Sequence, residues 1–86
     1  MKLLTLTLAS LITVPAFGAT ECTKEPKEKW KDQKAFEENL KKDYKIKIFK
    51  VTKGNCYEIY GWNKDGKKVE IYFNPVTGEK VKEKIN

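Results

Sequence analysis

After Gly18 the chain contains no histidine, no arginine and no serine. Serine–histidine triads, imidazole general bases and histidine metal sites are therefore excluded from that part of the chain. The guanidinium group, which holds phosphate with two parallel hydrogen bonds, is missing as well. An enzyme built from carboxylates alone would need a concave pocket, and a domain of this size has little interior to form one. We therefore expect a protein that is not an enzyme and that has no cofactor and no metal ion.

The one long apolar run is at the amino terminus. Lys2 precedes apolar residues 3–14, Pro15 ends the run, and small residues stand at 16 and 18 before Ala19. This pattern is typical of a secretory signal peptide over residues 1–18, cleaved after Gly18. The run is too short to span a bilayer, which disfavours a membrane anchor. We therefore expect one exported domain over residues 19–86, which is periplasmic or secreted. We expect no nucleic acid among its partners.

Two cysteines remain in this domain, Cys22 and Cys56. They permit only one intramolecular pairing, and an isolated pair in a small exported domain predicts a disulfide. The alternative is a redox or metal-binding pair. That alternative is disfavoured because the two residues are far apart in the sequence and no further ligand residues accompany them.

The first half of the domain has the composition of a helix. Residues 27–42 include no glycine and no β-branched residue, and Pro26 stands near the expected helix start. Trp30, Phe36 and Leu40 recur at helical spacing. The pattern predicts one helix from about residue 27 to about residue 42, with Trp30 as a core anchor rather than a ligand contact.

From Tyr44 the apolar period changes to two. Residues 44–48 alternate and residues 49–51 continue in the opposite phase, which predicts a bulge near Ile48 and Phe49. Residues 56–62 and 68–73 predict two further strands, joined by a hairpin turn at Asp65-Gly66. We expect an α+β fold, with one N-terminal helix packed on a three-stranded antiparallel β-meander and with one disulfide. A fourth strand around Val81 is the alternative.

Strand periodicity also predicts which side chains face away from the helix. Alternation places one set of apolar side chains on the helix and leaves the intervening residues facing outward. Aromatic residues next to lysine are typical of a protein-binding surface. Two alternatives stay open, namely cross-strand aromatic pairing that only stabilises the sheet and cover by the C-terminal tail. The predicted core residues are Tyr57, Ile59, Val69, Ile71 and Phe73, and the candidate binding residues are Tyr60, Trp62, Tyr72, Lys68 and Glu70.

An ordered set of residues resembles a known family. The set comprises Trp30, Tyr44-Lys-Ile46, Gly54-x-Cys56-Tyr57-Glu58-Ile59, Asp65-Gly66-Lys-Lys-Val69-Glu70 and Asn74-Pro75-x-Thr77-Gly78-Glu79. It is similar to small exported PepSY domains, which belong to the peptidase propeptide and YpeB-like domain family. Two residues depart from the family pattern, Asp43 where a glycine often stands and Asn74 where an aspartate is usual. The resemblance implies a non-catalytic domain that binds or restrains a peptidase, with no catalytic residues to carry over.

The charge pattern adds a second hypothesis. The formal charge is +6, and every positively charged side chain is a lysine. Lysine enrichment is typical of a soluble surface with protected edge strands, but it also attracts acidic partners. We therefore expect a monomer that binds an exported protein, for which a peptidase is a candidate. The alternative is a sensory or structural accessory of the cell envelope whose lysines contact anionic lipid or glycan.

Overall fold

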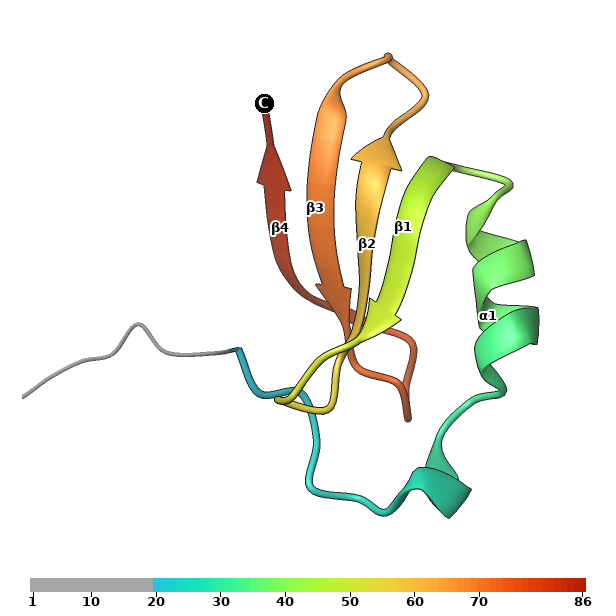
Figure 1. The fold of residues 1–86 in the computed structure, drawn as a ribbon, viewed down its shortest axis with the longest axis vertical. Helices are drawn as coiled ribbons and strands as arrows, with labels where there is room; N and C mark the ends of the chain where they lie inside the picture. Colours follow the sequence, from blue (N-terminus) through green and yellow to red (C-terminus); the bar gives the residue numbers. More distant parts are fainter. Residues whose placement is uncertain (1–19) are drawn as a thin grey trace, which may run out of the picture.

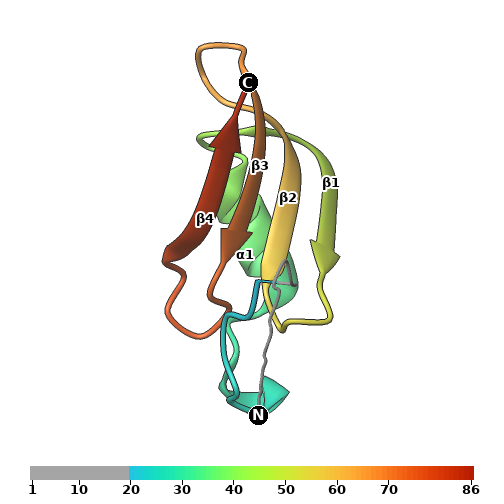
Figure 2. The same ribbon diagram turned by 90° about the vertical axis from the view of Figure 1, so that its left-hand side faces the viewer.

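The computed structural model describes residues 20–86, which form a four-stranded antiparallel sheet with one short helix on one face (Figures 1 and 2). The strand order follows the chain, β1-β2-β3-β4. The signal peptide predicted over residues 1–18 and its cleavage site lie outside the described residues. No helix in residues 20–86 is long and apolar enough to cross a membrane. The elements are η2 (Lys27–Lys29), α1 (Gln33–Leu40), β1 (Lys45–Val51), β2 (Tyr57–Trp62), β3 (Lys68–Phe73) and β4 (Lys80–Ile85).

The single helix predicted from about residue 27 to about residue 42 is wrong in its extent. A 3-10 turn ends at Lys29, and Trp30 has an extended backbone with φ −81° and ψ 150°. The Trp30 indole N–H donates to the carbonyl of Glu25 at 3.0 Å, and the N–H of Lys31 donates to the carbonyl of Pro75 at 2.7 Å. These contacts with backbone outside the helix outweigh the helix propensity of the segment.

The helix α1 is therefore short, and it begins with a cap. The Asp32 carboxylate accepts a hydrogen bond from the N–H of Ala35 at 2.9 Å, which satisfies one of the free N–H groups at a helix start. The helix ends at Leu40. Because the helix is eight residues long and does not begin the domain, the predicted α+β class holds only loosely.

The sheet has four strands, which confirms the alternative to the three-stranded meander. The tail around Val81 forms the edge strand β4, which pairs with β3 along most of its length. The predicted bulge is present in β1, but it lies one to two residues earlier, between Ile46 and Ile48. The predicted hairpin turn is present as well, and Gly66 takes the positive φ of 79° that such a turn requires.

The core lies between α1 and the sheet. Phe36 of α1 packs against Tyr57 and Phe73, with ring centroids 5.2 and 5.4 Å apart. Trp30 packs edge-on against Tyr57 at 5.7 Å, although it lies outside the helix. The Tyr57 hydroxyl donates to the carbonyl of Lys31 at 2.6 Å, which ties the segment before α1 to the sheet. All five predicted core residues of β2 and β3 are buried, together with Phe36, Leu40 and Cys56.

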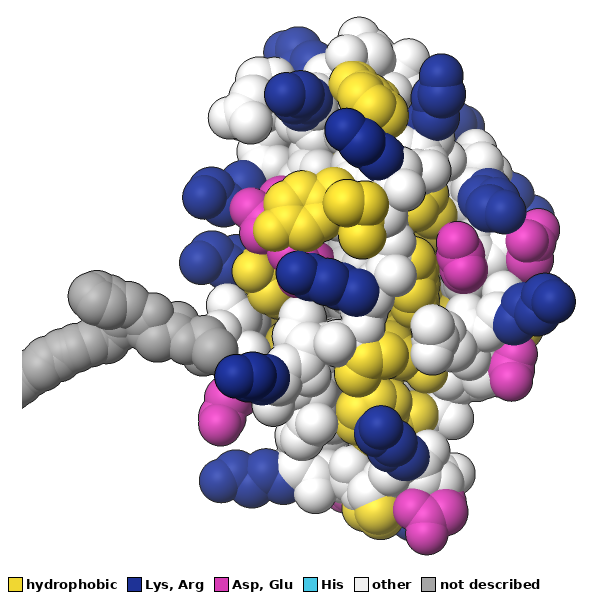
Figure 3. Space-filling model, viewed as in Figure 1, with side chains coloured by type: hydrophobic (Ala, Val, Ile, Leu, Met, Phe, Trp, Pro, Cys, Tyr) yellow, Lys and Arg dark blue, Asp and Glu magenta, His cyan; other side chains and the backbone are white. Residues whose placement is uncertain are grey.

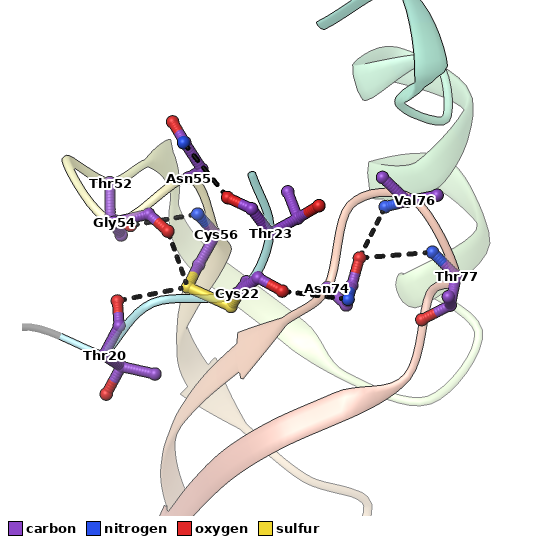
Figure 4. Close-up of a disulfide and its surroundings, with 10 residues drawn as sticks. All are labelled: Thr20, Cys22, Thr23, Thr52, Gly54, Asn55, Cys56, Asn74, Val76 and Thr77. Carbon is purple, nitrogen blue, oxygen red and sulfur yellow. Dashed lines mark hydrogen bonds between the residues drawn. A yellow bond between two sulfur atoms is a disulfide. The ribbon is translucent and has the colours of Figure 1, made fainter. Parts of the chain in front are cut away.

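The predicted disulfide between Cys22 and Cys56 is present (Figure 4). It fastens the extended segment before η2 to the turn between β1 and β2. The N–H of Cys22 also donates to the carbonyl of Gly54 at 2.9 Å. A Cβ on Gly54 would lie 2.0 Å from the carbonyl oxygen of Thr20, so only glycine permits the segment to approach this closely.

Candidate binding face of the sheet

The sheet face opposite α1 is called the outer face here, and it points toward the viewer in Figure 2. In antiparallel strands, residues that pair directly lie on the same face. Tyr60 pairs with Glu70, and Trp62 pairs with Lys68. Alternate residues of β2 and β3 therefore bring together all five of the predicted binding residues. The outer face of these two strands consists of Glu58, Tyr60, Trp62, Lys68, Glu70 and Tyr72.

The aromatic rings of the outer face are half-buried because lysine side chains lie across them. The Nζ atoms of Lys45, Lys50 and Lys82 lie 5.8, 5.6 and 5.9 Å from the ring centroids of Trp62, Tyr60 and Tyr72, respectively. Such contacts combine cation–π attraction with packing of the apolar lysine stem. In Figure 3 the outer face lies toward the left, where lysine side chains stand beside exposed hydrophobic ones.

A groove of about 410 Å³ lies over the Trp62 end of the outer face. Its apolar part includes Ile48 of β1, whose exposed fraction is 45%. Position 61 of β2 requires a glycine, because a Cβ there would lie 2.0 Å from the carbonyl oxygen of Lys45 on β1. The strand β1 can therefore lie close to β2 at its bulge. The groove is lined by Lys47, Ile48, Tyr60, Gly61, Trp62, Lys68, Val69, Glu70, Lys84 and Asn86.

Strand periodicity did not predict that a buried carboxyl group, with a second carboxyl next to it, lies in the middle of the outer face. The Glu58 side chain is only 2% exposed, and its Oε1 lies 3.8 Å from the Nζ of Lys50. Its Oε2 is buried and has no hydrogen-bond donor among the described residues. Glu70 is the neighbouring carboxyl on β3, and its Oε1 lies 3.9 Å from the Nζ of Lys84. The signal in the sequence was that both glutamates fall on the same predicted face of adjacent strands.

The opposite pKa shifts of the two carboxyl groups indicate that they share a proton. Burial raises the pKa of Glu58, and its hydrogen bond with Glu70 raises it further. The same hydrogen bond from Glu58 lowers the pKa of Glu70, which is the ionised partner. A protonated Glu58 is itself a donor to Glu70, so its buried oxygen no longer needs a donor from another residue.

Two tyrosines complete this hydrogen-bond network. The Tyr72 hydroxyl donates to Oε2 of Glu70 at 3.1 Å. Burial and this hydrogen bond raise the pKa of Tyr72 to about 12. The hydrogen bond to Glu70 likewise raises the pKa of Tyr60, with burial as the next cause. Both hydroxyls therefore stay protonated and fix the two rings on the outer face.

The outer face offers donors, a carboxyl pair and apolar surface, which are the elements of a recognition site. Within residues 20–86 no cluster of three or more histidine, cysteine, aspartate or glutamate side chains is placed to hold a metal ion. Comparison with models of protein families gave a match to the peptidase propeptide and YPEB domain, PepSY, over residues 2–84. The chain belongs to the PepSY family. Comparison with curated proteins and with solved structures gave no match.

PepSY domains are in general non-catalytic modules that resemble propeptides. In this PepSY domain the Asn74 turn has a defined local role. Its side-chain oxygen accepts hydrogen bonds from the N–H groups of Val76 and Thr77 at 2.8 and 3.3 Å. Its side-chain amide donates to the carbonyl of Cys22 at 3.0 Å (Figure 4). An ionised aspartate at this position could not donate this last bond.

Proposed function

We propose that this PepSY domain is a non-catalytic exported binding module that engages a protein partner through its outer face. The candidate partner is a secreted or periplasmic peptidase, or another envelope protein. The family relationship supports a propeptide-like role, and the disulfide fits an oxidising compartment. The observation that carries the proposal is the groove on the outer face, in which Tyr60 and Trp62 lie among lysines. Aromatic residues in such positions contribute most of the affinity at protein interfaces.

The proposal is tested by the variant Trp62→Ala. Trp62 is half-buried at the end of β2, so its truncation should cost about 2 kcal/mol of the free energy of unfolding. A core tryptophan would cost about 3 to 5 kcal/mol. We expect the variant to remain folded and to lose capture of a partner from an envelope extract, with the captured protein identified and its binding then measured directly.

The matched control is Trp30→Ala. Trp30 packs against Tyr57 on the opposite side of the sheet, so this variant should lose more stability but keep partner capture wherever it is folded. The proposal is wrong if Trp62→Ala captures the same partner with the same affinity as the wild-type protein. It is also wrong if Trp62→Ala unfolds like a core variant, because Trp62 would then be a core residue.

The exposed lysines of the edge strand favour a second candidate function. Lys80, Lys82 and Lys84 alternate along β4, every residue of which is exposed. Such a strand could hold the domain on anionic lipid or glycan as an envelope accessory. Salt separates the two functions, because attraction to a polyanion weakens steeply with ionic strength and apolar docking does not. The measurement is co-sedimentation with anionic vesicles at low and high salt.

A further inference from the structure

We propose that the groove at the Trp62 end of the outer face binds an acidic peptide segment that carries one large apolar side chain. This inference rests on the proposed function and names the chemistry of the partner's contact segment. The volume of about 410 Å³ lies at the small end of the range for ligand pockets. It suits a short stretch of chain rather than a folded domain.

The apolar part of the groove supplies the first half of the argument. Ile48 of β1 follows Lys47 and is 45% exposed, which is a large exposed fraction for an isoleucine. Tyr60 pairs with Ile48 across the strands, and Trp62 lies two residues further along β2. The three side chains form one apolar surface, which a partner's aromatic or aliphatic side chain would remove from water.

The charged rim supplies the second half. Lys47 and Lys68 line the groove, and within residues 20–86 neither has a carboxylate at ion-pair distance. Lys84 also lines it, and its partner is Glu70 at 3.9 Å. Glu70 is the one acidic side chain of the lining. The lining side chains therefore carry a net positive charge, and a segment with carboxylates on both sides of an apolar residue would complement it.

A membrane surface fits the groove less well. Lysines that bind a flat array of headgroups act from an exposed plane, whereas here they surround a hollow with an apolar floor. A peptide whose carboxylates flank an inserted apolar side chain would contact both the lysines of the rim and the apolar floor. Binding to vesicles is therefore an outcome that counts against the inference.

The test uses the full-length exported protein in its oxidised form and a synthetic peptide. The peptide has a central phenylalanine with two acidic residues on each side. One control peptide has serine in the centre, and another has asparagine and glutamine in place of the acids. We expect saturable binding of the first peptide by calorimetry and at least fivefold weaker binding of each control. The affinity of the first peptide should fall between about 50 mM and about 500 mM NaCl, as screening predicts.

Variants of the protein locate the site. The pair Lys47→Gln with Lys68→Gln should weaken binding of the acidic peptide about five- to tenfold, because each exposed ion pair contributes little. The matched pair Lys29→Gln with Lys34→Gln removes the same charge from exposed positions of η2 and α1 on the other side of the sheet. It should leave the affinity within a factor of two. Ile48→Ala should weaken binding of the phenylalanine peptide but not of the serine peptide.

Several outcomes would overturn the inference. Equal affinity for the acidic and the amide peptide would remove the role of charge, and equal loss in the two lysine pairs would indicate non-specific attraction. Absence of saturable binding at millimolar peptide, or binding to phosphatidylglycerol vesicles that the peptide does not displace, would also contradict it. The peptide series requires no variant, so it decides the matter even if a variant fails to fold. If the peptide fails while partner capture still depends on Trp62, the inference is wrong and the proposed function stands.

Discussion

Glu58 shows how one buried side chain can organise the outer face. An ionised carboxylate that is 2% exposed would cost several kcal/mol without full pairing. Lys50 at 3.8 Å compensates only one of its oxygens. A proton held with Glu70 removes the charge from Glu58 and leaves Glu70 ionised next to Tyr72 and Lys84. The hydrogen bonds of Glu70 thereby hold the tyrosine hydroxyls of the outer face in place.

This arrangement makes the stability of the domain depend on pH. The pKa of Glu58 is raised in the folded state, so its contribution is full below the ordinary glutamate pKa and is lost as the pH rises through the raised value. Glu70, whose pKa is lowered, contributes above the ordinary glutamate pKa and loses its contribution only in more acidic solution. Between the ordinary glutamate pKa and the raised pKa of Glu58, the titration of Glu58 determines the trend, so the stability of the domain declines as the pH rises.

We therefore predict that Glu58→Gln raises the melting temperature at neutral and alkaline pH. Glutamine is uncharged and can still donate to Glu70, so it reproduces the protonated form at every pH. A gain of about 1 kcal/mol corresponds to about 4 to 8 °C in a domain of this size. The measurement is thermal unfolding by circular dichroism from about pH 4 to about pH 9. Glu38→Gln, at an exposed ion pair on α1, is the control and should change little. A melting temperature of Glu58→Gln below that of the wild-type protein at pH 8 would contradict the shared proton.

Asn74 gives a second prediction at the same scale. Asn74→Asp keeps the oxygen that accepts from Val76 and Thr77 but places an anionic oxygen against the carbonyl of Cys22. We expect a loss of about 1 kcal/mol in the free energy of unfolding, because one hydrogen bond becomes a repulsive contact. The loss should shrink in acid, where a protonated aspartate donates again.

Asn63→Asp is the matched control for this prediction. The Asn63 side chain accepts hydrogen bonds from the N–H groups of Asp65 and Lys67 through its oxygen, a role that aspartate also fills. Chemical denaturation of both variants checks the difference. If they are destabilised equally, the bond to Cys22 does not distinguish the two positions.

At the scale of elements, the sequence predicted the sheet better than the helix. Hydrophobic alternation predicted which residues of β2 and β3 face the helix, because this pattern depends only on the residues of each strand. The Asp65-Gly66 turn then determined how the two strands pair. The helix failed because Trp30 and Lys31 bond to Glu25 and Pro75, and the contact with Pro75 arises only in the folded chain. The edge strand β4 was understated because every residue in it is exposed, so it adds no buried apolar side chain to the predicted core.

Gly61 links the strand geometry to the groove. We predict that Gly61→Ala destabilises the domain by about 1 to 3 kcal/mol, as overpacking does. The new Cβ would lie 2.0 Å from the carbonyl oxygen of Lys45, so β1 would have to move away from β2. Gly66→Asn is the control, since Gly66 has open space around its Cβ position and asparagine tolerates positive φ. Urea unfolding that gives the same midpoint for Gly61→Ala and the wild-type protein would show that β1 accommodates the methyl group.

At the scale of the whole molecule, the predicted binding residues came together although their environment was not foreseen. Tyr60, Trp62 and Tyr72 lie on one face as their spacing requires. Periodicity reports direction, however, and not the lysine stems from β1 and β4 that half-bury the rings. Nor does it report that Glu58 becomes buried, since that depends on what neighbouring strands place beside it.

The disulfide decides how firmly the whole domain is held, because α1 is short and the segment before it has little regular structure. We predict that reduction lowers the melting temperature by ten degrees or more. Cys22 and Cys56 are 34 residues apart, and closing a loop of that size stabilises the folded state by about 3.8 kcal/mol in the chain-entropy account. Such a loss corresponds to a shift of at least about ten degrees in a small domain. Thermal unfolding with and without reductant measures the shift, and the double variant Cys22→Ala, Cys56→Ala should reproduce it without any reductant. Two titratable thiols in non-reduced exported protein, or a reduced form that melts within a few degrees of the oxidised one, would mean that the hydrogen bonds from Asn55 and Asn74 hold the segment without the covalent bond.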